Sequence, residues 1–106
     1  MKYKPSKKIL EIIPGLFKTE DIPPEERLVY IHFLIEGWDW YIVEYDPEDR
    51  IFFGFVDGES VPFPEWGYIE YENLKALRSG PVEVEIEKNW KIRPMKEVLP
   101  SHKYNR

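Results

Sequence analysis

The feature that most constrains the fold is a run of three strand-like segments between residues 28 and 57. They are LVYIHFLI (28–35), WDWYIVEY (38–45) and IFFGFVD (51–57). All are rich in the β-branched and aromatic residues that strands favour. Only Glu36-Gly37 separates the first two, and such a two-residue turn predicts a tight hairpin. Its predicted cross-strand pairs are Ile35–Trp38, Phe33–Trp40 and Ile31–Ile42. The run therefore predicts a three-stranded antiparallel meander.

Side-chain alternation along these strands predicts which face of the sheet is the core. One face collects Val29, Ile31, Phe33, Ile35, Trp38, Trp40, Ile42, Ile51, Phe53 and Phe55, together with Glu44 and Asp57. The other collects Leu28, Tyr30, His32, Leu34, Asp39, Tyr41, Val43, Tyr45, Phe52, Gly54 and Val56. Burying one large apolar side chain contributes roughly 1.5–3 kcal/mol. We therefore expect the first face to be dry and the second to be partly wet.

The remaining segments predict two short helices and a second hairpin. Ser6 can cap a first helix that Pro14-Gly15 ends, and a second helix is expected from about Tyr71 to Arg78. GESVPFPEWG (58–67) reads as a Pro/Gly loop between the third strand segment and the second helix. VEVEIEKNWKIR (82–93) reads as a hairpin, with Asn89 in the left-handed position of its loop. The expected fold class is α+β: a meander, a C-terminal β-hairpin and two short helices on one face.

Composition restricts the class of protein further. The 106 residues suffice for one domain, with residues 1–5 and 100–106 expected as mobile ends. No apolar stretch approaches the ~20 residues of a membrane span, and no secretory signal is evident, so we expect a cytoplasmic protein without a membrane partner. Zero cysteines exclude disulfides and Cys-ligated metals. Abundant Glu and Lys with no Gln is a composition typical of heat-adapted proteins.

Several ordered motifs resemble one family. WDWYIVEYDPEDRIFFGFVDG (38–58) and PEWGYIEYENL (64–74) carry the patterns W-x-W-Y-x-x-E-x-D-P, F-F-G-x-V-x-G and P-E-x-G-Y. These are similar to a family of small bacterial, plasmid and phage proteins known only as a domain of unknown function. The resemblance runs from the first helix to about residue 99, and Lys88-Asn89 replaces the family's Arg-Asp pair. It implies no activity, substrate or cofactor, only that such proteins often travel with mobile elements.

Three residues are candidates for acid–base or metal chemistry. Alternation places Glu44 and Asp57 on one face, where two carboxylates can act as an acid–base pair or bind a metal ion. The competing interpretation is that both bind loop N–H groups or a basic side chain. His32 is a possible general base, but it lies opposite Tyr41 and more simply is a packed strand residue. No P-loop, H-x-x-x-H or G-x-G-x-x-G motif is present, and no cofactor is expected.

An aromatic-rich band supplies the candidate binding residues. They are Trp38, Trp40, Tyr41, Trp66 and Tyr68. Aromatic side chains bind bases, sugars and peptides, although most in a small domain belong to the core. Trp66 is expected to be exposed because it lies in the Pro/Gly loop.

Charge distribution favours one of three functional hypotheses. Residues 20–72 carry fifteen acids against two bases, whereas both ends of the chain are basic. An acidic centre repels phosphate, so nucleic acid is disfavoured as a partner. The leading hypothesis is a non-enzymatic module that recognises a basic protein partner. The alternatives are a hydrolase or metal-dependent enzyme using Glu44 and Asp57, and single-stranded nucleic-acid binding through exposed Tyr30, Tyr41, Tyr45 and Phe52. A strand-paired dimer is a further possibility, because a small sheet has two open edges.

Overall fold

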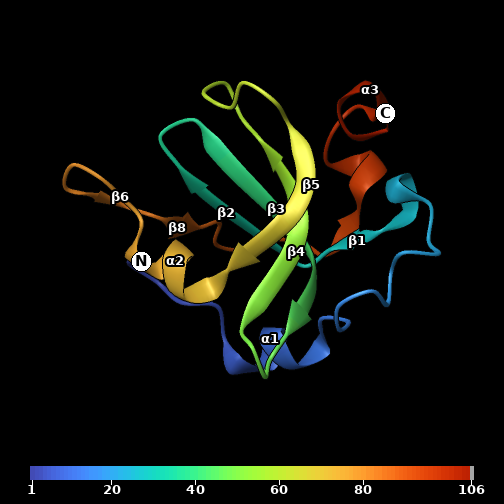
Figure 1. The fold of residues 1–106 in the computed structure, drawn as a ribbon, viewed down its shortest axis with the longest axis horizontal. Coiled ribbons are helices and arrows are strands. Elements are labelled where there is room, and N and C mark those ends of the chain that lie inside the picture. Colours follow the sequence, from blue (N-terminus) through green and yellow to red (C-terminus); the bar gives the residue numbers. More distant parts are fainter. Residues whose placement is uncertain (106) are drawn as a thin grey trace.

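A five-stranded antiparallel sheet in the order β5-β4-β3-β2-β8 is the frame of the computed structural model, which describes residues 1–105 (Figure 1). The strands are β2 (Ile31–Ile35), β3 (Trp38–Asp46), β4 (Ile51–Asp57), β5 (Glu65–Glu70) and β8 (Glu85–Ile86). Two short strand pairs lie beside it: β1 (Leu28–Val29) with β9 (Arg93–Pro94), and β6 (Arg78–Ser79) with β7 (Val82–Glu83). The helices are α1 (Lys7–Ile12), α2 (Tyr71–Ala76) and α3 (Ser101–Tyr104), with 3-10 turns η1 (Pro24–Glu26) and η2 (Met95–Glu97). The α+β class is confirmed, and the expected meander forms the middle of the sheet.

The β2–β3 hairpin follows the sequence prediction. Glu36 and Gly37 both have positive φ, 42° and 82°, as the two-residue turns that match strand twist require. All three predicted cross-strand pairs are present, from Ile35–Trp38 at the turn to Ile31–Ile42. The predicted strand 28–35 is interrupted only at Tyr30, whose N–H still donates to the Ile42 carbonyl at 2.9 Å.

A β-bulge in β3 changes which side chains of β4 share a face with the first half of β3. The register shifts between Ile42, which pairs with Gly54, and Glu44, which pairs with Phe53. The extra residue moves every later side chain of the pair to the other face. The expectation that Phe53 and Phe55 share a face with Ile31 and Phe33 is therefore wrong, and Phe52 takes that place. A Cβ at residue 54 would collide with the Tyr41 carbonyl, so the strands approach closely enough to require glycine there.

The sheet gains a strand that the sequence analysis assigned to a loop. Residues 65–70 form β5 and pair with β4 along their whole length, from Ile51–Glu70 to Val56–Glu65. The loop signal is correct only up to residue 64. Trp66 and Tyr68 alternate with smaller residues, which is the strand pattern that the nearby prolines concealed.

The hairpin predicted over residues 82–93 does not form. Val82–Glu83 pairs with Arg78–Ser79, Glu85–Ile86 joins β2, and Arg93–Pro94 joins β1. Asn89 nevertheless has the predicted left-handed backbone, with φ 62°. An isolated two-stranded hairpin buries little surface, whereas pairing with β2 lets this segment place Val84 in the core.

Both longer helices pack on one face of the sheet, as predicted. The Ser6 hydroxyl caps α1 by accepting from the Ile9 N–H at 3.1 Å. The core between this face and the helices includes Ile13, Ile31, Phe33, Trp40, Ile42, Tyr45, Phe52, Tyr71 and Leu74. No helix within residues 1–105 is long and apolar enough to span a membrane.

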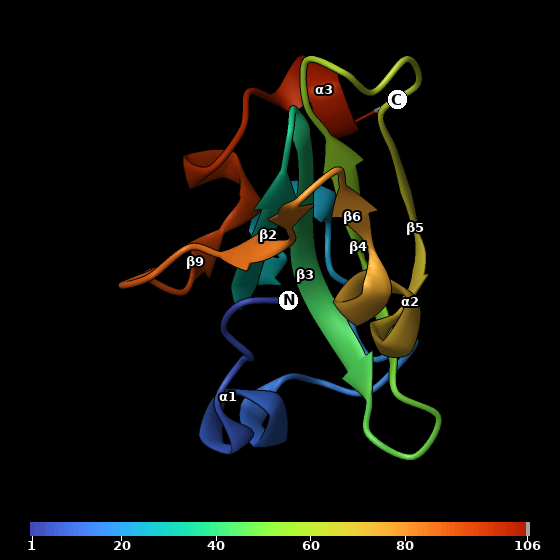
Figure 2. The same cartoon turned by 90° about the vertical axis from the view of Figure 1, so that its left-hand side faces the viewer.

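The opposite face is a second core and not the partly wet surface that we expected. The C-terminal segment covers it, so that α2 and β9 lie on opposite sides of β3 (Figure 2). The members of this core are Val29, Tyr41, Val43, Phe55, Met95 and Tyr104. The expected mobile end 100–106 thus contains a helix, α3, whose Tyr104 is 3% exposed; residue 106 lies outside the described residues. At the other end, expected to be mobile over residues 1–5, Pro5 is buried and the Lys2 N–H donates to the Val84 carbonyl.

Candidate functional site

Glu44 is a buried carboxylate that holds a loop in place. Its oxygens accept hydrogen bonds from the N–H groups of Phe17 and Thr19, each at 2.9 Å, and from the Thr19 hydroxyl. The side chain needs these donors because the residue is only 2% exposed. Phe17 itself has a φ of 70°, a value that residues other than glycine rarely adopt. Contacts from outside the loop therefore hold its conformation. Glu44 therefore fastens the loop around residues 17–19 to β3.

Asp57 is the equivalent anchor for the C-terminal helix. Its carboxylate is buried and receives the Lys103 ammonium, with the Nζ–Oδ2 distance at 3.1 Å. Asp39 lies directly across from it on β3. Two carboxylates facing each other repel, so each is stabilised by a partner of its own. For Asp57 that partner is the Lys103 ammonium.

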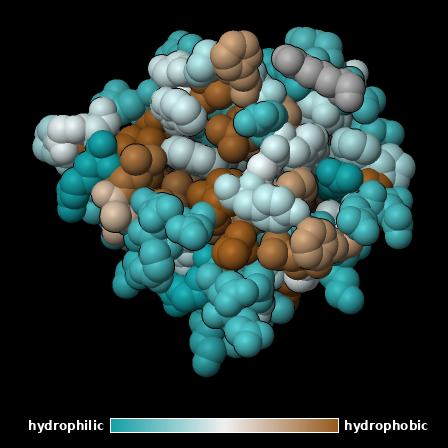
Figure 3. Space-filling view, in the orientation of Figure 1, coloured by the Kyte–Doolittle hydropathy of each residue, from teal (hydrophilic) through white to brown (hydrophobic). Residues whose placement is uncertain are grey.

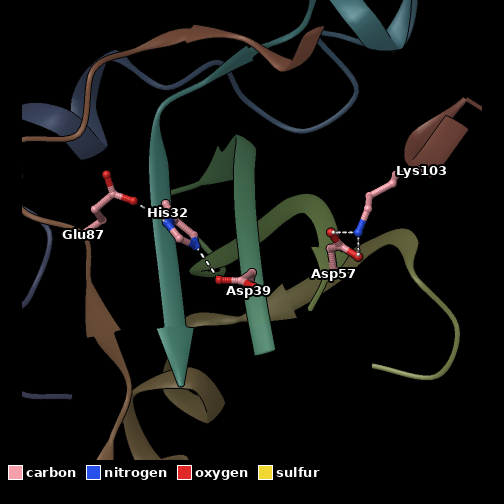
Figure 4. A network of polar contacts seen from close by, with 5 residues as sticks. All are labelled: His32, Asp39, Asp57, Glu87 and Lys103. Atoms are coloured by element: carbon pink, nitrogen blue, oxygen red, sulfur yellow. Dashed lines mark hydrogen bonds and ion pairs between the residues drawn. The ribbon is translucent and has the colours of Figure 1, made fainter. Parts of the chain in front are cut away.

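His32 is the polar partner of Asp39. Its Nε2 lies 2.7 Å from Asp39 Oδ1, and its Nδ1 lies 2.7 Å from Glu87 Oε1 (Figure 4). Both ring nitrogens thus lie within hydrogen-bonding distance of a carboxylate oxygen, so the ring links two acidic side chains from different parts of the chain. The ring also stacks on Tyr41, with 4.6 Å between centroids. Through these contacts His32 joins β2 to β3 and to the residue after β8.

Tyr41 is kept neutral by the same surroundings. Burial raises the pKa of its phenol, and the negative charges of Asp39, Asp57 and Glu87 raise that pKa further. A phenol with a raised pKa stays protonated near neutral pH and is a poor acid there. Tyr41 therefore adds packing to the network rather than proton transfer.

The structure does not bring Glu44 and Asp57 together. Glu44 pairs with Phe53, and Asp57 lies four residues farther along β4, which corresponds to ~13 Å of strand. Within residues 1–105, no group of three or more His, Asp or Glu side chains is arranged to hold a metal ion. An enzyme built on Glu44 and Asp57 would need the carboxylates within ~4–6 Å of each other or of a shared ion. This arrangement lacks that proximity.

The predicted aromatic band divides into buried and exposed members. Trp40 and Tyr41 are buried, whereas Trp38 is 38% and Tyr68 57% exposed. Trp66, expected to be exposed, is half-buried. Its indole N–H donates to the Tyr104 carbonyl at 3.2 Å, and its ring stacks on Phe53. The expectation failed because Trp66 belongs to β5 and not to a loop.

The tyrosine-bearing face does not form an exposed platform. Tyr41, Tyr45 and Phe52 are all buried. Moreover, the β3 bulge places Tyr45 and Phe52 in the helix-covered core and Tyr41 in the opposite one. Stacking of nucleobases requires several aromatic rings exposed together. These residues do not meet that condition.

An apolar hollow remains open on the helix-covered side, as Figure 3 shows between the β6–β7 hairpin and β5. The Trp38 and Trp40 rings stack with 6.1 Å between centroids, and a groove lies on each side of them. The first, here named the Leu77 groove, measures about 430 Å³ and is lined by Ile35, Glu36, Trp38, Trp40, Leu77 and Arg78, among others. The second, here named the Gly67 groove, measures about 390 Å³ and includes Trp38, Trp40, Val56, Phe63, Gly67 and Ile69.

The rim of these grooves is acidic and exposed. Glu36 lines the Leu77 groove, Glu65 lines the Gly67 groove, and Glu59 lies beside the turn at Gly37. In the part of the chain that the structure describes, no salt bridge engages any of these three glutamates. Arg78 is the basic residue of the lining, and it lies 3.6 Å from Glu83. The rim therefore has negative charge available for a ligand.

Sequence reasoning missed three residues of this surface. Phe63 is 78% exposed, Leu77 is exposed where the second helix was expected to continue, and Gly67 lies in the floor of a groove. The signals were an isolated phenylalanine among prolines and a glycine between two aromatic residues. Neither signal can be interpreted until residues 65–70 are recognised as a strand. Comparison with protein-family models, with curated proteins and with solved structures gives no match.

Proposed function

We propose that the chain is a protein-interaction module that binds a basic segment of a partner protein on the surface around Trp38. The observation that carries the proposal is the pair of grooves on either side of the Trp38–Trp40 stack. Apolar side chains beside these grooves are exposed. On the opposite face of the sheet, by contrast, the same chain buries Tyr41 and Phe55. A contiguous apolar surface rimmed by polar groups is typical of an interaction site.

The acidic rim supports a basic partner. Glu36, Glu59 and Glu65 lie around the grooves, and no salt bridge among residues 1–105 involves them. Residues 20–72 are also strongly acidic as a whole. Lys and Arg carry long apolar stems as well as charge, so they can lie along tryptophan rings while the charged ends reach carboxylates. The exposed Trp38 ring offers such a contact.

Selection from a library of random displayed peptides tests this function. The chain is immobilised, and peptides that also bind the Trp38→Ser, Phe63→Ser double variant are removed. We expect the enriched peptides to be rich in Lys and Arg and to contain apolar residues. Their affinity should fall with added salt, because exposed charge pairs are screened.

A matched variant separates the grooves from general apolar exposure. Ile12 on α1 is also an exposed apolar residue, 54% accessible, and lies away from both grooves. Ile12→Ser should leave peptide binding unchanged, and thermal unfolding should show that every variant is folded. Failure to enrich any peptide, or equal binding to the double variant, would overturn the proposal.

A further inference from the structure

The outer edge of β5 is an open strand edge. The backbone hydrogen bonds described for residues 1–105 join Glu65–Ile69 to β4 alone, and Figure 2 shows β5 at the outer margin of the sheet. The opposite edge, β8, is only two residues long. An open edge offers a row of unpaired N–H and C=O groups on which an extended chain can pair. β5 is therefore the place where this sheet can accept another strand.

Gly67, in the middle of β5, has no structural reason to be glycine. Its φ lies outside the left-handed region, and a Cβ built there would meet no atom within 4 Å. Glycine weakens a strand interior and often marks a place where a ligand or another backbone approaches closely. Here the missing side chain leaves the floor of the Gly67 groove open. The groove thus continues onto the strand edge.

Charge selects the occupant of this edge. β5 begins at Glu65 and ends at Glu70. If two copies paired antiparallel with Gly67 opposite Tyr68, each Glu65 would face a Glu70, and like charges directly opposite are destabilising. A basic chain in the same position would instead place cations opposite both carboxylates. The edge is therefore better matched to a basic segment than to a second copy.

We infer that the basic segment binds as an antiparallel strand added to β5, with a large apolar side chain above Gly67. This inference rests on the proposed function and specifies how the partner is held. In this register, partner residues opposite Glu70 and Glu65 are basic and those opposite Ile69 and Gly67 are apolar. The apolar residue opposite Gly67 points into the groove beside Trp40, because side chains directly across a sheet share a face.

The register defines a probe peptide, Lys-Val-Thr-Phe-Thr-Lys, whose first residue lies opposite Glu70. Its control replaces both lysines with glutamate. We expect the lysine peptide to bind about tenfold or more tightly than the glutamate peptide, since two favourable cross-strand pairs become unfavourable. Amide hydrogen exchange followed by NMR should slow at alternate residues of β5, those whose N–H groups point away from β4.

Two N-methylated forms of the peptide test strand pairing directly. Alternate residues of an added strand point their N–H groups toward β5, so methylation in one phase should abolish binding and methylation in the other should preserve it. Equal binding of both forms, with no slowing of exchange in β5, would overturn the inference.

Substitution of Gly67 separates the groove from the fold. Gly67→Val should raise the melting temperature, because valine suits a strand and has room, and yet should weaken peptide binding at least tenfold. Gly67→Ala should change the melting temperature and the peptide affinity in the same directions by smaller amounts. It remains informative if the Gly67→Val variant does not fold. Gly15→Ala is the matched control, since Gly15 also has ordinary φ and a Cβ contact no closer than 3.9 Å. Unchanged binding to both Gly67 variants would contradict the inference.

The failures of the two proposals are distinguishable. Selected library peptides that require Trp38 and Phe63 but ignore Gly67→Val and N-methylation would leave the interaction function standing and remove the added strand. Sedimentation showing that the chain alone forms a dimer broken by Gly67→Val would assign the edge to a second copy and overturn the inference. Absence of any selected peptide would overturn both.

Discussion

The two faces of the central sheet carry similar residues and use them differently. On the face covered by the C-terminal segment, Glu44, Asp57 and His32 each bind groups of the same chain. On the face around Trp38, the exposed carboxylates Glu36 and Glu65 have no cationic partner among residues 1–105. Acidic and aromatic side chains therefore do not by themselves locate a functional surface. What distinguishes the faces is whether the folded chain satisfies those groups itself.

The C-terminal segment produces this difference. Met95 and Tyr104 complete the apolar layer over Tyr41 and Phe55, and Lys103 neutralises Asp57. On the other face the helices stop short of the Trp38 end of the sheet, and the grooves stay open. If this comparison is correct, substitutions that break polar contacts on the closed face reduce stability, whereas substitutions on the open face reduce binding without reducing stability.

Glu44→Gln should produce the largest loss of stability. The amide retains one acceptor oxygen but directs an NH₂ group at the donors of Phe17 and Thr19, leaving a buried polar mismatch. We expect the free energy of unfolding to fall by about 2–4 kcal/mol, measured by urea denaturation. Glu20→Gln, at an exposed glutamate in the same loop, should change it by less than about 0.5 kcal/mol. Equal small effects at both positions would mean that Glu44 is not a structural anchor.

The sequence predicted those parts of the fold in which local signals and tertiary contacts agree. A two-residue Glu36-Gly37 turn fixes the hairpin register, so the pairs on either side of it follow from counting. Ser6 and the residues after it likewise specify the first helix locally. Alternation then failed at Val43, because a bulge inserts one residue without any distinctive residue type. The C-terminal hairpin failed because each half found a partner strand elsewhere.

The candidate site was predicted by residue type but not by position. Trp38 and Tyr68 are exposed as a binding surface requires, whereas Trp40 and Tyr41 are buried and Trp66 is half-buried. Their accessibility depends on the β5 strand and on the C-terminal cover, and both are long-range features. Lys103 and Glu87, the partners of Asp57 and His32, lie 46 and 55 residues away along the chain. Spacing within a motif cannot reveal such contacts.

His32→Phe should produce the second largest loss of stability. Phenylalanine preserves a ring on Tyr41 but removes both hydrogen bonds and leaves Asp39 and Glu87 without the polar group between them. A loss of about 2–3 kcal/mol is expected, again from urea denaturation. Asp39→Asn is the milder control, because its amide oxygen can still accept from Nε2 and its repulsion of Asp57 disappears. A stable His32→Phe variant would indicate that the imidazole is held for chemistry and not for the fold.

Tyr104→Phe should change the stability less, and should raise it instead of lowering it. The Tyr104 hydroxyl is buried in the second core and has no hydrogen-bond partner within the described chain. Removing an unsatisfied buried hydroxyl should raise the free energy of unfolding by about 1 kcal/mol, detectable as a higher melting temperature. A decrease would instead show that the hydroxyl has a polar contact in solution, so that its burial does not destabilise the fold.

Phe63→Ser should have the smallest effect on stability and is the sharpest test of the contrast. Phe63 is 78% exposed at the mouth of the Gly67 groove, so the folded chain gains little from its ring. We expect the free energy of unfolding to change by no more than about 0.5 kcal/mol, while the affinity for selected basic peptides falls several-fold. The same two measurements on Ile12→Ser should show neither change in binding nor a large change in stability. If Phe63→Ser instead unfolded the chain, the ring would be required for the fold. Its exposure would then no longer support a binding surface around Trp38.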